Sequence, residues 1–288
     1  MIKINLKQMK LISIETENFK LDGGAMFGVV PKVMWQKLYP ADQNNLCNWA
    51  MRCLLVDDGQ RRILIDTGIG YKQDQKFLKH YYLNGDNTLL KSLKKNGYSP
   101  EDITDVVHTH LHFDHCGGTI KYDDNKNLVP TFPNANLWVG KAHWETATNP
   151  NRRERASFLK ENILPMQESG KLKLIENEGE LFPNFHIKFF NGHTEGQVVP
   201  HINYNDKWLI YGADVFPAAA HIPAPYIMSY DMCAIKTLEE RNAFYKEAIE
   251  KNYTLFFEHD FYNECCSLTE GKRGVVADKT FTLSEFCK

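Results

Sequence analysis

The chain has 288 residues, of which 43% are hydrophobic and 12% aromatic, and its formal net charge at pH 7 is −2. This charge balance gives no basic surface for nucleic acid, and no apolar run approaches the roughly 20 residues of a membrane span. We therefore expect one domain over residues 1–288 that acts on a small molecule, with neither nucleic acid nor a membrane as a partner.

The first 45 or so residues predict an N-terminal arm. Residues 1–19 (MIKINLKQMKLISIETENF) alternate charged and apolar side chains and lack the apolar core of a secretory signal. Residues 23–39 (GGAMFGVVPKVMWQKLY) are apolar and aromatic, and they predict either a substrate channel or part of the core. The candidates for a channel lining are Met26, Phe27, Val30 and Trp35. Because an aromatic arm could also pack on a second copy, a homodimer is a plausible assembly.

After the arm, turn chemistry and hydrophobic periodicity predict strands and helices. Residues 51–56 and 62–66 predict a hairpin around Asp57-Asp58-Gly59. Residues 87–96 have the spacing of a helix, with Gly97 as its C-cap. Residues 103–108 (ITDVVH) then predict a short buried strand.

That strand leads directly into the most informative stretch of the chain, THLHFDHCGG at residues 109–118. The stretch contains an H-x-H-x-D-H motif made of His110, His112, Asp114 and His115. Neutral imidazole and carboxylate are the ligand types that bind zinc and its borderline neighbours. A strand that ends in this motif places His110 and His112 on one face of a turn, with Asp114 and His115 just beyond. One loop can therefore supply ligands to two metals.

Beyond the motif, strands and helices continue to alternate. A charged, amphipathic helix is predicted at residues 151–162. Residues 237–251 predict a second helix, with Thr237 as N-cap and Glu240 completing a capping box. Further strands are predicted at residues 135–139, 171–176, 186–190 and 254–257. The intervals lack the regular βαβ spacing of a doubly wound sheet.

Seven cysteines are scattered along the chain. An odd, dispersed set in a chain of this length does not predict a disulfide framework, so reduced thiols and a cytoplasmic location are expected. Cys116 directly follows His115, and we expect it to pack behind the motif as a small buried residue. The adjacent Cys265 and Cys266 form no C-x-x-C motif and are expected to be structural.

The H-x-H-x-D-H motif resembles that of the metallo-β-lactamase-fold hydrolases. That family's pattern adds an Asp before the motif and then a His, an Asp and a last His. The chain has, in order, Asp66 in ILIDTG, His193 in NGHTEGQ, Asp214 in YGADVF and His259 in FFEHD, each after a short apolar run. The resemblance covers about residues 10–260. It implies an α/β fold, the αββα sandwich in which two β-sheets are flanked by helices.

The resemblance also implies two divalent metal ions. The first would be held by His110, His112 and His193, and the second by Asp114, His115 and His259, with Asp214 as a bridge. Zinc is the default, and manganese, cobalt and iron stay open because affinity order alone does not decide loading. A water shared by two such metals becomes a nucleophile near neutral pH, and Asp114 could shuttle a proton to the leaving group. Asp66 is expected either to hydrogen-bond backbone or ligand histidines or to serve as a turn residue.

Within the family, the aromatic segment at residues 23–39 and DVFPAAAH at residues 214–221 resemble the N-acyl-homoserine-lactone lactonases and the methyl parathion hydrolases. The resemblance implies opening of the lactone ring of N-acyl homoserine lactones by a metal-bridging hydroxide. Hydrolysis of a phosphotriester, a thioester or a β-lactam is the alternative. A non-catalytic metal-binding module is a minor one.

The chain departs from the lactonase pattern at one position. The best-known lactonases carry a Tyr three residues after the bridging Asp, where this chain has Pro217. His221 and Tyr226 are the candidates to replace it as catalytic hydrogen-bond donors to the substrate, on the basis of their position alone.

Overall fold

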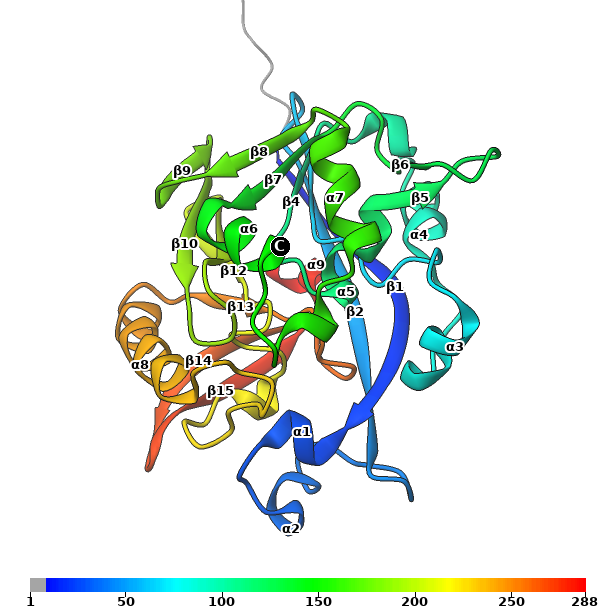
Figure 1. Cartoon of the computed structure of the whole chain (residues 1–288). Helices are drawn as coiled ribbons and strands as arrows, with labels where there is room; N and C mark the ends of the chain where they lie inside the picture. Colours follow the sequence, from blue (N-terminus) through cyan, green and yellow to red (C-terminus); the bar gives the residue numbers. More distant parts are fainter. Residues whose placement is uncertain (1–8) are drawn as a thin grey trace, which may run out of the picture.

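A computed structural model describes residues 9–288. Two β-sheets packed face to face form the centre of the molecule (Figure 1). The first sheet has six strands in the order β1-β2-β3-β4-β7-β8, and the second has seven in the order β15-β14-β13-β12-β11-β10-β9. Strands β5 and β6 form a separate pair.

The strands of the first sheet are β1 (Lys10–Asp22), β2 (Leu46–Asp57), β3 (Arg62–Ile65), β4 (Asp105–Val107), β7 (Asn136–Gly140) and β8 (Leu172–Ile175). Those of the second are β9 (Gly179–Phe182), β10 (Phe185–Phe190), β11 (Gln197–Tyr204), β12 (Lys207–Tyr211), β13 (Thr254–Phe256), β14 (Cys265–Gly271) and β15 (Gly274–Phe281). The separate pair is β5 (Ile120–Tyr122) and β6 (Leu128–Pro130).

The α-helices are α1 (Gly23–Phe27), α2 (Lys32–Trp35), α3 (Gln75–Leu78), α4 (Leu89–Lys95), α5 (Phe113–Cys116), α6 (Lys141–Thr148), α7 (Lys160–Glu168), α8 (Ala234–Glu250) and α9 (Leu283–Phe286). Short 3₁₀ turns occupy Lys79–Tyr81, Pro100–Asp102, Gly117–Thr119, Arg155–Ser157 and Ala219–His221.

Side-chain alternation along the strands builds the layers. In β3, Ile63 and Ile65 belong to the core between the two sheets, whereas Leu64 belongs to the core under helices α4, α6 and α7. On the other side of the molecule, α8 covers the outer face of the second sheet with side chains such as Phe244 and Ala248 (Figure 1). Helices therefore flank both sheets, and the αββα sandwich expected from the sequence is confirmed. None of the described helices is long and apolar enough to cross a membrane.

The predicted arm is partly built into the sandwich. Strand β1 pairs antiparallel with β2 from Lys10↔Asp57 to Asp22↔Leu46 and forms the edge of the first sheet. Only α1, α2 and the chain up to β2 remain as a projection, at the bottom of Figure 1. Residues 1–8 of the arm lie outside the described residues.

Most predicted elements appear within a few residues of their expected positions, but two differ. Residues 151–159, predicted as the first part of a helix, form turns instead, and α7 begins at Lys160. The side-chain oxygen of Asn151 accepts hydrogen bonds from the backbone N–H groups of Arg153 and Glu154, which favours a turn over a helix. Helix α8 begins at Ala234 rather than at Thr237. Glu240, expected to complete a capping box, instead accepts hydrogen bonds from the backbone N–H of Gly192.

Candidate metal centre

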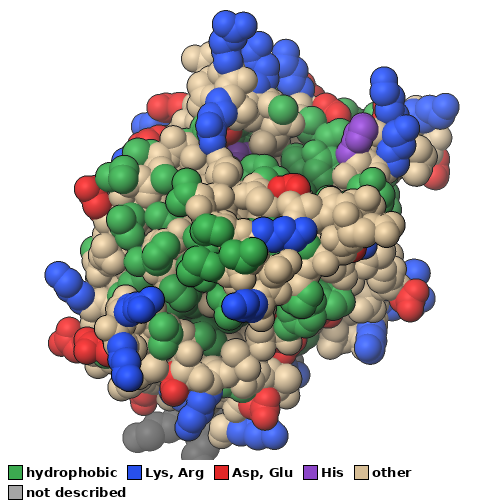
Figure 2. All heavy atoms as spheres, turned by 90° about the horizontal axis from the view of Figure 1, so that it is seen from below, with side chains coloured by type: hydrophobic (Ala, Val, Ile, Leu, Met, Phe, Trp, Pro, Cys, Tyr) green, Lys and Arg blue, Asp and Glu red, His purple; other side chains and the backbone are tan. Residues whose placement is uncertain are grey.

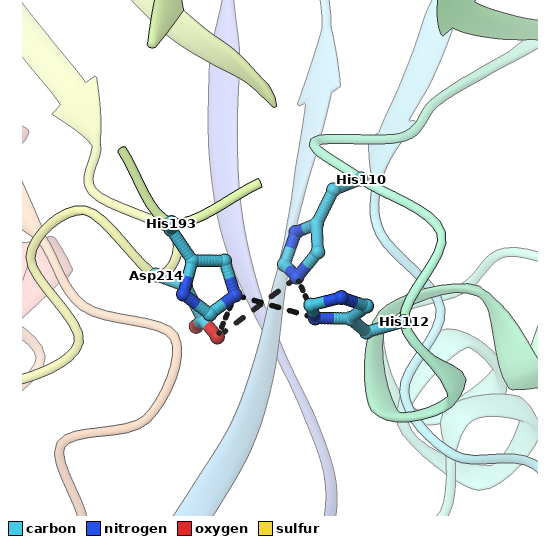
Figure 3. A group of neighbouring side chains, drawn as sticks. All are labelled: His110, His112, His193 and Asp214. Carbon is cyan, nitrogen blue, oxygen red and sulfur yellow. Dashed lines mark hydrogen bonds and ion pairs between the residues drawn. The ribbon is translucent and has the colours of Figure 1, made fainter. Parts of the chain in front are cut away.

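The four residues His110, His112, His193 and Asp214 form a first cluster of inward-facing side chains (Figure 3). His112 Nδ1 lies 3.0 Å from His110 Nε2 and 3.2 Å from His193 Nε2. Asp214 Oδ2 lies 3.2 Å from His193 Nε2. These side chains follow strands β4, β10 and β12, so the ends of the strands bring distant parts of the sequence together.

Asp114, His115 and His259 form a second cluster beside the first. The Nε2 atoms of His115 and His259 are 3.2 Å apart, and Asp114 Oδ2 lies 3.8 Å and 3.9 Å from them. Helix α5 carries Asp114 and His115, and His259 follows β13.

Asp214 contacts both clusters with different oxygens. Its Oδ2 faces His193, whereas its Oδ1 lies 2.9 Å from His259 Nε2 and 3.5 Å from His115 Nε2. Asp214 Oδ1 is buried without a hydrogen-bond partner among the described residues. A carboxylate placed in this way can bridge two cations, one in each cluster.

Each clustered histidine also has a partner for its outward-facing nitrogen. His110 Nδ1 lies 3.0 Å from Thr109 Oγ1, and His259 Nδ1 lies 2.8 Å from the Ala50 carbonyl. The remaining pairs are His112 Nε2 with Glu154 Oε1 at 3.3 Å, His193 Nδ1 with Asp231 Oδ1 at 2.9 Å, and His115 Nδ1 with Asp66 Oδ2 at 3.2 Å and Glu258 Oε2 at 3.0 Å. An outer acceptor keeps the proton on the outer nitrogen, which leaves the inner lone pair free for a metal. The residues present therefore fit divalent cations.

Asp66 combines the two roles expected of it. It accepts hydrogen bonds from the backbone N–H and the hydroxyl of Thr109, at 2.8 and 2.6 Å, and it faces His115 Nδ1. Its φ of 56° lies in the left-handed region, which Asp tolerates better than most residues. Asp66 thus turns the chain after β3 and holds the start of the motif.

The electrostatics of the two clusters favour added positive charge. Burial lowers the pKa of His110 well below its usual value, and the neighbouring His115 lowers it further, so this ring is neutral. At His259 burial also acts to lower the pKa, but the charge of Asp214, its hydrogen bond and the charge of Glu258 together outweigh burial and raise the pKa to about 9. Burial raises the pKa of Glu258 to about 8, although the charge of His115 opposes that shift. A divalent cation bound between the two clusters would offset the negative charge of these buried carboxylates, Asp214 and Glu258.

A cavity of about 420 Å³ opens over both clusters. Its lining is largely apolar or aromatic and includes Leu21, Met26, Tyr81, Phe113, Met228, Tyr230 and Met232. Of the four predicted channel residues, only Met26 lines it. Phe27, Val30 and Trp35 belong to an aromatic core behind the cavity, where Phe27 and Trp35 stack at 5.1 Å. For these three residues the prediction of a substrate contact was wrong, because their side chains are used to pack the projection onto the sheet.

The two predicted substituents for the lactonase Tyr do not line the cavity. His221 is buried, its Nε2 donates to the Met26 carbonyl at 2.9 Å, and its ring stacks on Phe27. Tyr226 packs edge-on against Phe27, away from the cavity. Their predicted catalytic roles are therefore corrected to structural ones. The phenols that do line the cavity are Tyr81 and Tyr230.

Several polar residues of the site were not singled out from the sequence. Glu154, Asp231 and Glu258 face ligand histidines, and Arg153 lines the cavity. Glu258 directly precedes His259, and this adjacency was a usable signal. The other three lie in segments without a strand or motif nearby, so no pattern in the sequence marks them.

Comparison with known proteins places this geometry in context. The sequence model of the metallo-beta-lactamase superfamily matches residues 52–248. An N-acyl homoserine lactonase of Bacillus cereus is 28% identical in a 162-residue alignment that covers 53% of this chain and 58% of that protein. The match therefore spans less than two thirds of the relative. A probable metallo-hydrolase of Mycobacterium tuberculosis is 25% identical in a 223-residue alignment that covers 67% of each protein.

Solved structures extend the likeness to nearly the whole chain. A probable metal-dependent hydrolase from Staphylococcus aureus superposes with a TM-score of 0.85 and 27% identity, covering 97% of this chain and all of the other. AidC, a dizinc quorum-quenching lactonase, superposes with a TM-score of 0.78 over 97% of both chains. At 23% identity, this second likeness is one of fold alone.

Proposed function

The chain belongs to the metallo-β-lactamase superfamily, and on that premise we propose that it is a binuclear metal-dependent hydrolase that opens the lactone ring of N-acyl homoserine lactones. The observation that carries the proposal is Asp214, whose two oxygens face two separate histidine clusters beneath one apolar cavity. Relatives named as N-acyl homoserine lactonases support the substrate class.

We assign the first cation to His110, His112 and His193 and the second to Asp114, His115 and His259, with Asp214 shared. Zinc is the proposed metal because imidazole and carboxylate ligands suit it. Two bound cations would lower the pKa of a shared water and polarise the carbonyl of the ester.

The protein's own residues position the substrate. The apolar wall that includes Leu21, Met26 and Phe113 would hold the acyl chain and exclude water from the reacting end. Burial raises the pKa of Tyr230 to about 12, and the charge of Asp114 adds to the shift. The phenol therefore keeps its proton at neutral pH and can donate to an oxygen of the substrate. Asp114, which also lines the cavity, would carry a proton to the departing alkoxide.

The test is hydrolysis of N-hexanoyl- and N-dodecanoyl-homoserine lactone by protein of measured metal content, followed as proton release. Paraoxon and nitrocefin serve as parallel substrates for the phosphotriester and β-lactam alternatives. We expect lactone turnover that falls by about 10³-fold or more in His110→Ala and Asp214→Ala. His80→Ala, which alters an exposed histidine outside both clusters, is the matched control.

The outcomes separate the alternatives. Two metals per chain with negligible lactone turnover would refute the substrate assignment and leave a metallohydrolase of another ester class. Full metal content with no turnover of any ester, in the wild type as in Asp114→Asn, would favour the non-catalytic module.

We also propose that the protein forms a homodimer through the projection formed by α1 and α2. The side chains of Val29, Val33, Met34 and Leu38 are exposed there, and Val29 is 94% exposed. Figure 2 shows the face seen from below, where hydrophobic side chains gather. Light scattering after size exclusion should give twice the 33.3 kDa chain mass, and Val33→Asp should return it to the monomer value. A wild-type monomer would refute this.

A further inference from the structure

Residues 151–154 contact three separate segments that carry side chains of the metal centre. Glu154 reaches the motif at His112 and the next segment at Thr194. The guanidinium of Arg153 donates to the Ser229 carbonyl, and Asn151 Nδ2 lies 3.6 Å from Met232 Sδ. Asp231, the partner of His193, lies between these last two contacts in the sequence. We call residues 151–154 the bridging segment.

Glu154 is the residue of the bridging segment that touches a candidate ligand. Its side chain is buried, with 5% of the residue exposed. Oε1 lies 3.3 Å from His112 Nε2 and also accepts a hydrogen bond from the Thr194 hydroxyl. Oε2 accepts from Asn151 Nδ2 at 3.1 Å, and the backbone N–H of Glu154 donates to Asn151 Oδ1 at 3.0 Å. The bridging segment itself therefore holds the Glu154 carboxylate in place, independently of its contacts with His112 and Thr194.

This contact decides which nitrogen of His112 faces inward. His112 presents Nδ1 to His110 and His193, and only Nε2 can reach Glu154. An acceptor at Nε2 selects the tautomer with a proton there, so Nδ1 carries the lone pair. A ring rotated by half a turn would bring a carbon to the centre and lose the contact with the carboxylate. The same oxygen restrains Thr194, the residue next to His193, so one carboxylate ties together two segments that supply ligands.

We propose that Glu154 is a positioning residue of the metal centre, which fixes the ring of His112 and joins the His112 and His193 segments from outside. The inference rests on the metal-binding part of the proposed function and not on the substrate. Partners of this kind on ligand histidines typically contribute 10–100-fold to metal affinity. The effect belongs to the cluster of His110, His112 and His193, because Glu154 has no hydrogen bond or ion pair with the second cluster among the described residues.

The test measures zinc affinity rather than turnover. Zinc-loaded protein is titrated with a chromogenic chelator, and the two bound equivalents are followed separately. We expect Glu154→Ala to release one equivalent at about 10–100-fold lower chelator concentration and to leave the other unchanged. Glu154→Gln keeps an oxygen acceptor at the same length and should rescue most of the affinity. Glu154→Asp withdraws the acceptor by one methylene and should fall between the two. Glu145→Ala, at an exposed glutamate of α6, is the matched control and should retain wild-type affinity.

A Glu154→Ala variant that holds both zinc equivalents with wild-type affinity would overturn the proposal. If Glu154→Ala does not fold, Glu154→Asp decides, and wild-type affinity in that variant overturns the proposal equally. A cobalt-loaded sample gives a second readout, because a rotated His112 ring changes the d–d absorption of one site and not of the other. Failure of the substrate assignment would look different, since lactone turnover would be absent while zinc binding followed the expected order. A wild type that binds no zinc would overturn both proposals.

Discussion

Replacing Tyr230 with Phe removes one hydroxyl from the cavity wall and little else. Tyr230 is 42% exposed and lines the cavity over both clusters. Burial and the charges of Asp114 and Asp22 raise the pKa of its phenol to about 12, so the hydroxyl is a donor throughout the neutral range. If it donates to the substrate oxygen on which charge develops, its removal should lower kcat/KM without changing metal content.

The size of the effect follows from the exposure of the donor. Removing a donor from a water-excluded oxyanion site costs about 10²–10³ in rate. Water can partly replace a hydroxyl that is 42% exposed, so we expect a smaller loss. The expected decrease in kcat/KM for N-hexanoyl-homoserine lactone is about 10–100-fold, or about 1.4–2.7 kcal/mol.

The assay follows proton release with metal-quantified protein between pH 6.5 and 9. Tyr81→Phe is the matched control, because its phenol lines the same cavity and burial likewise raises its pKa to about 12. The Tyr81 ring is held against Phe113 and Phe77, so its variant should stay within about threefold of wild type. Neither variant should shift the pH profile, because neither phenol titrates in this range. Wild-type kcat/KM in Tyr230→Phe, or an equal loss in Tyr81→Phe, would refute the reasoning.

Two further predictions follow from charged groups. Among residues 9–288, Arg153 is the one Lys or Arg that lines the cavity, and its guanidinium can donate to the amide oxygen of an acyl homoserine lactone. Arg153→Ala should therefore raise KM about 10-fold for N-hexanoyl-homoserine lactone and less than twofold for γ-decanolactone, which has no amide. Equal changes in KM for the two lactones in steady-state kinetics would contradict this. Burial lowers the pKa of four histidines to about 3 or 4, namely His108, His143, His201 and His221. As pH drops from about 6.5 toward 4, these histidines bind protons in the unfolded chain but not in the folded one, so the stability of the fold decreases. The raised pKa of His259, about 9, acts in the other direction, because the stability that it contributes below pH 6.5 is lost as pH rises through 9. The urea midpoint of metal-free protein should therefore be lower at pH 5 and at pH 9 than at pH 6.5. Bound zinc should remove only the decrease in stability at pH 9. Equal midpoints at pH 5 and pH 6.5 would contradict the lowered pKa of the four buried histidines.

The candidate ligands could be predicted from the sequence because the H-x-H-x-D-H motif and the family that it resembles supplied their order, and most of them follow a short apolar run. His110, His193, Asp214 and His259 come just after strands, and strand ends meet at the edges of the two sheets. The order of the strands along the chain therefore indicated which of these residues lie close together. The same holds for Asp66, which directly follows β3, forms the turn there and faces His115.

The partners of those ligands could not be predicted in this way. Glu154 lies 42 residues from His112, and Asp231 lies 38 residues from His193. Both belong to turns or coil, where neither hydrophobic periodicity nor strand order fixes their position. The charged stretch at residues 151–162 was predicted as a helix because its side chains fit a helical face, yet two of those polar groups are used to build a turn and hold a histidine.

The apolar side chains of the segment at residues 23–39 show a second limit of prediction from sequence. Composition indicated that Met26, Phe27, Val30 and Trp35 would be covered, but it could not say whether by substrate or by protein. The structure divides them by the direction of each side chain. Met26 faces the cavity, whereas Phe27 lies between Trp35, Tyr39, Trp49 and His221.

The charge around the two clusters bears on the class of substrate. Six carboxylates face the five clustered histidines or belong to the clusters themselves, namely Asp66, Asp114, Glu154, Asp214, Asp231 and Glu258. Two divalent cations supply four positive charges, so the loaded centre stays negative even when Glu258 holds a proton, as its raised pKa of about 8 allows. Such a centre disfavours a substrate with a carboxylate next to the reacting bond, because the two negative charges repel in a cavity of low polarity. A β-lactam carries that carboxylate, whereas a homoserine lactone and a phosphotriester are neutral at the reacting end. Arg153, on the cavity wall, supplies a single compensating charge there. The charge balance therefore supports a neutral ester over an anionic one, and the side-by-side assay of lactone, paraoxon and nitrocefin measures that preference directly.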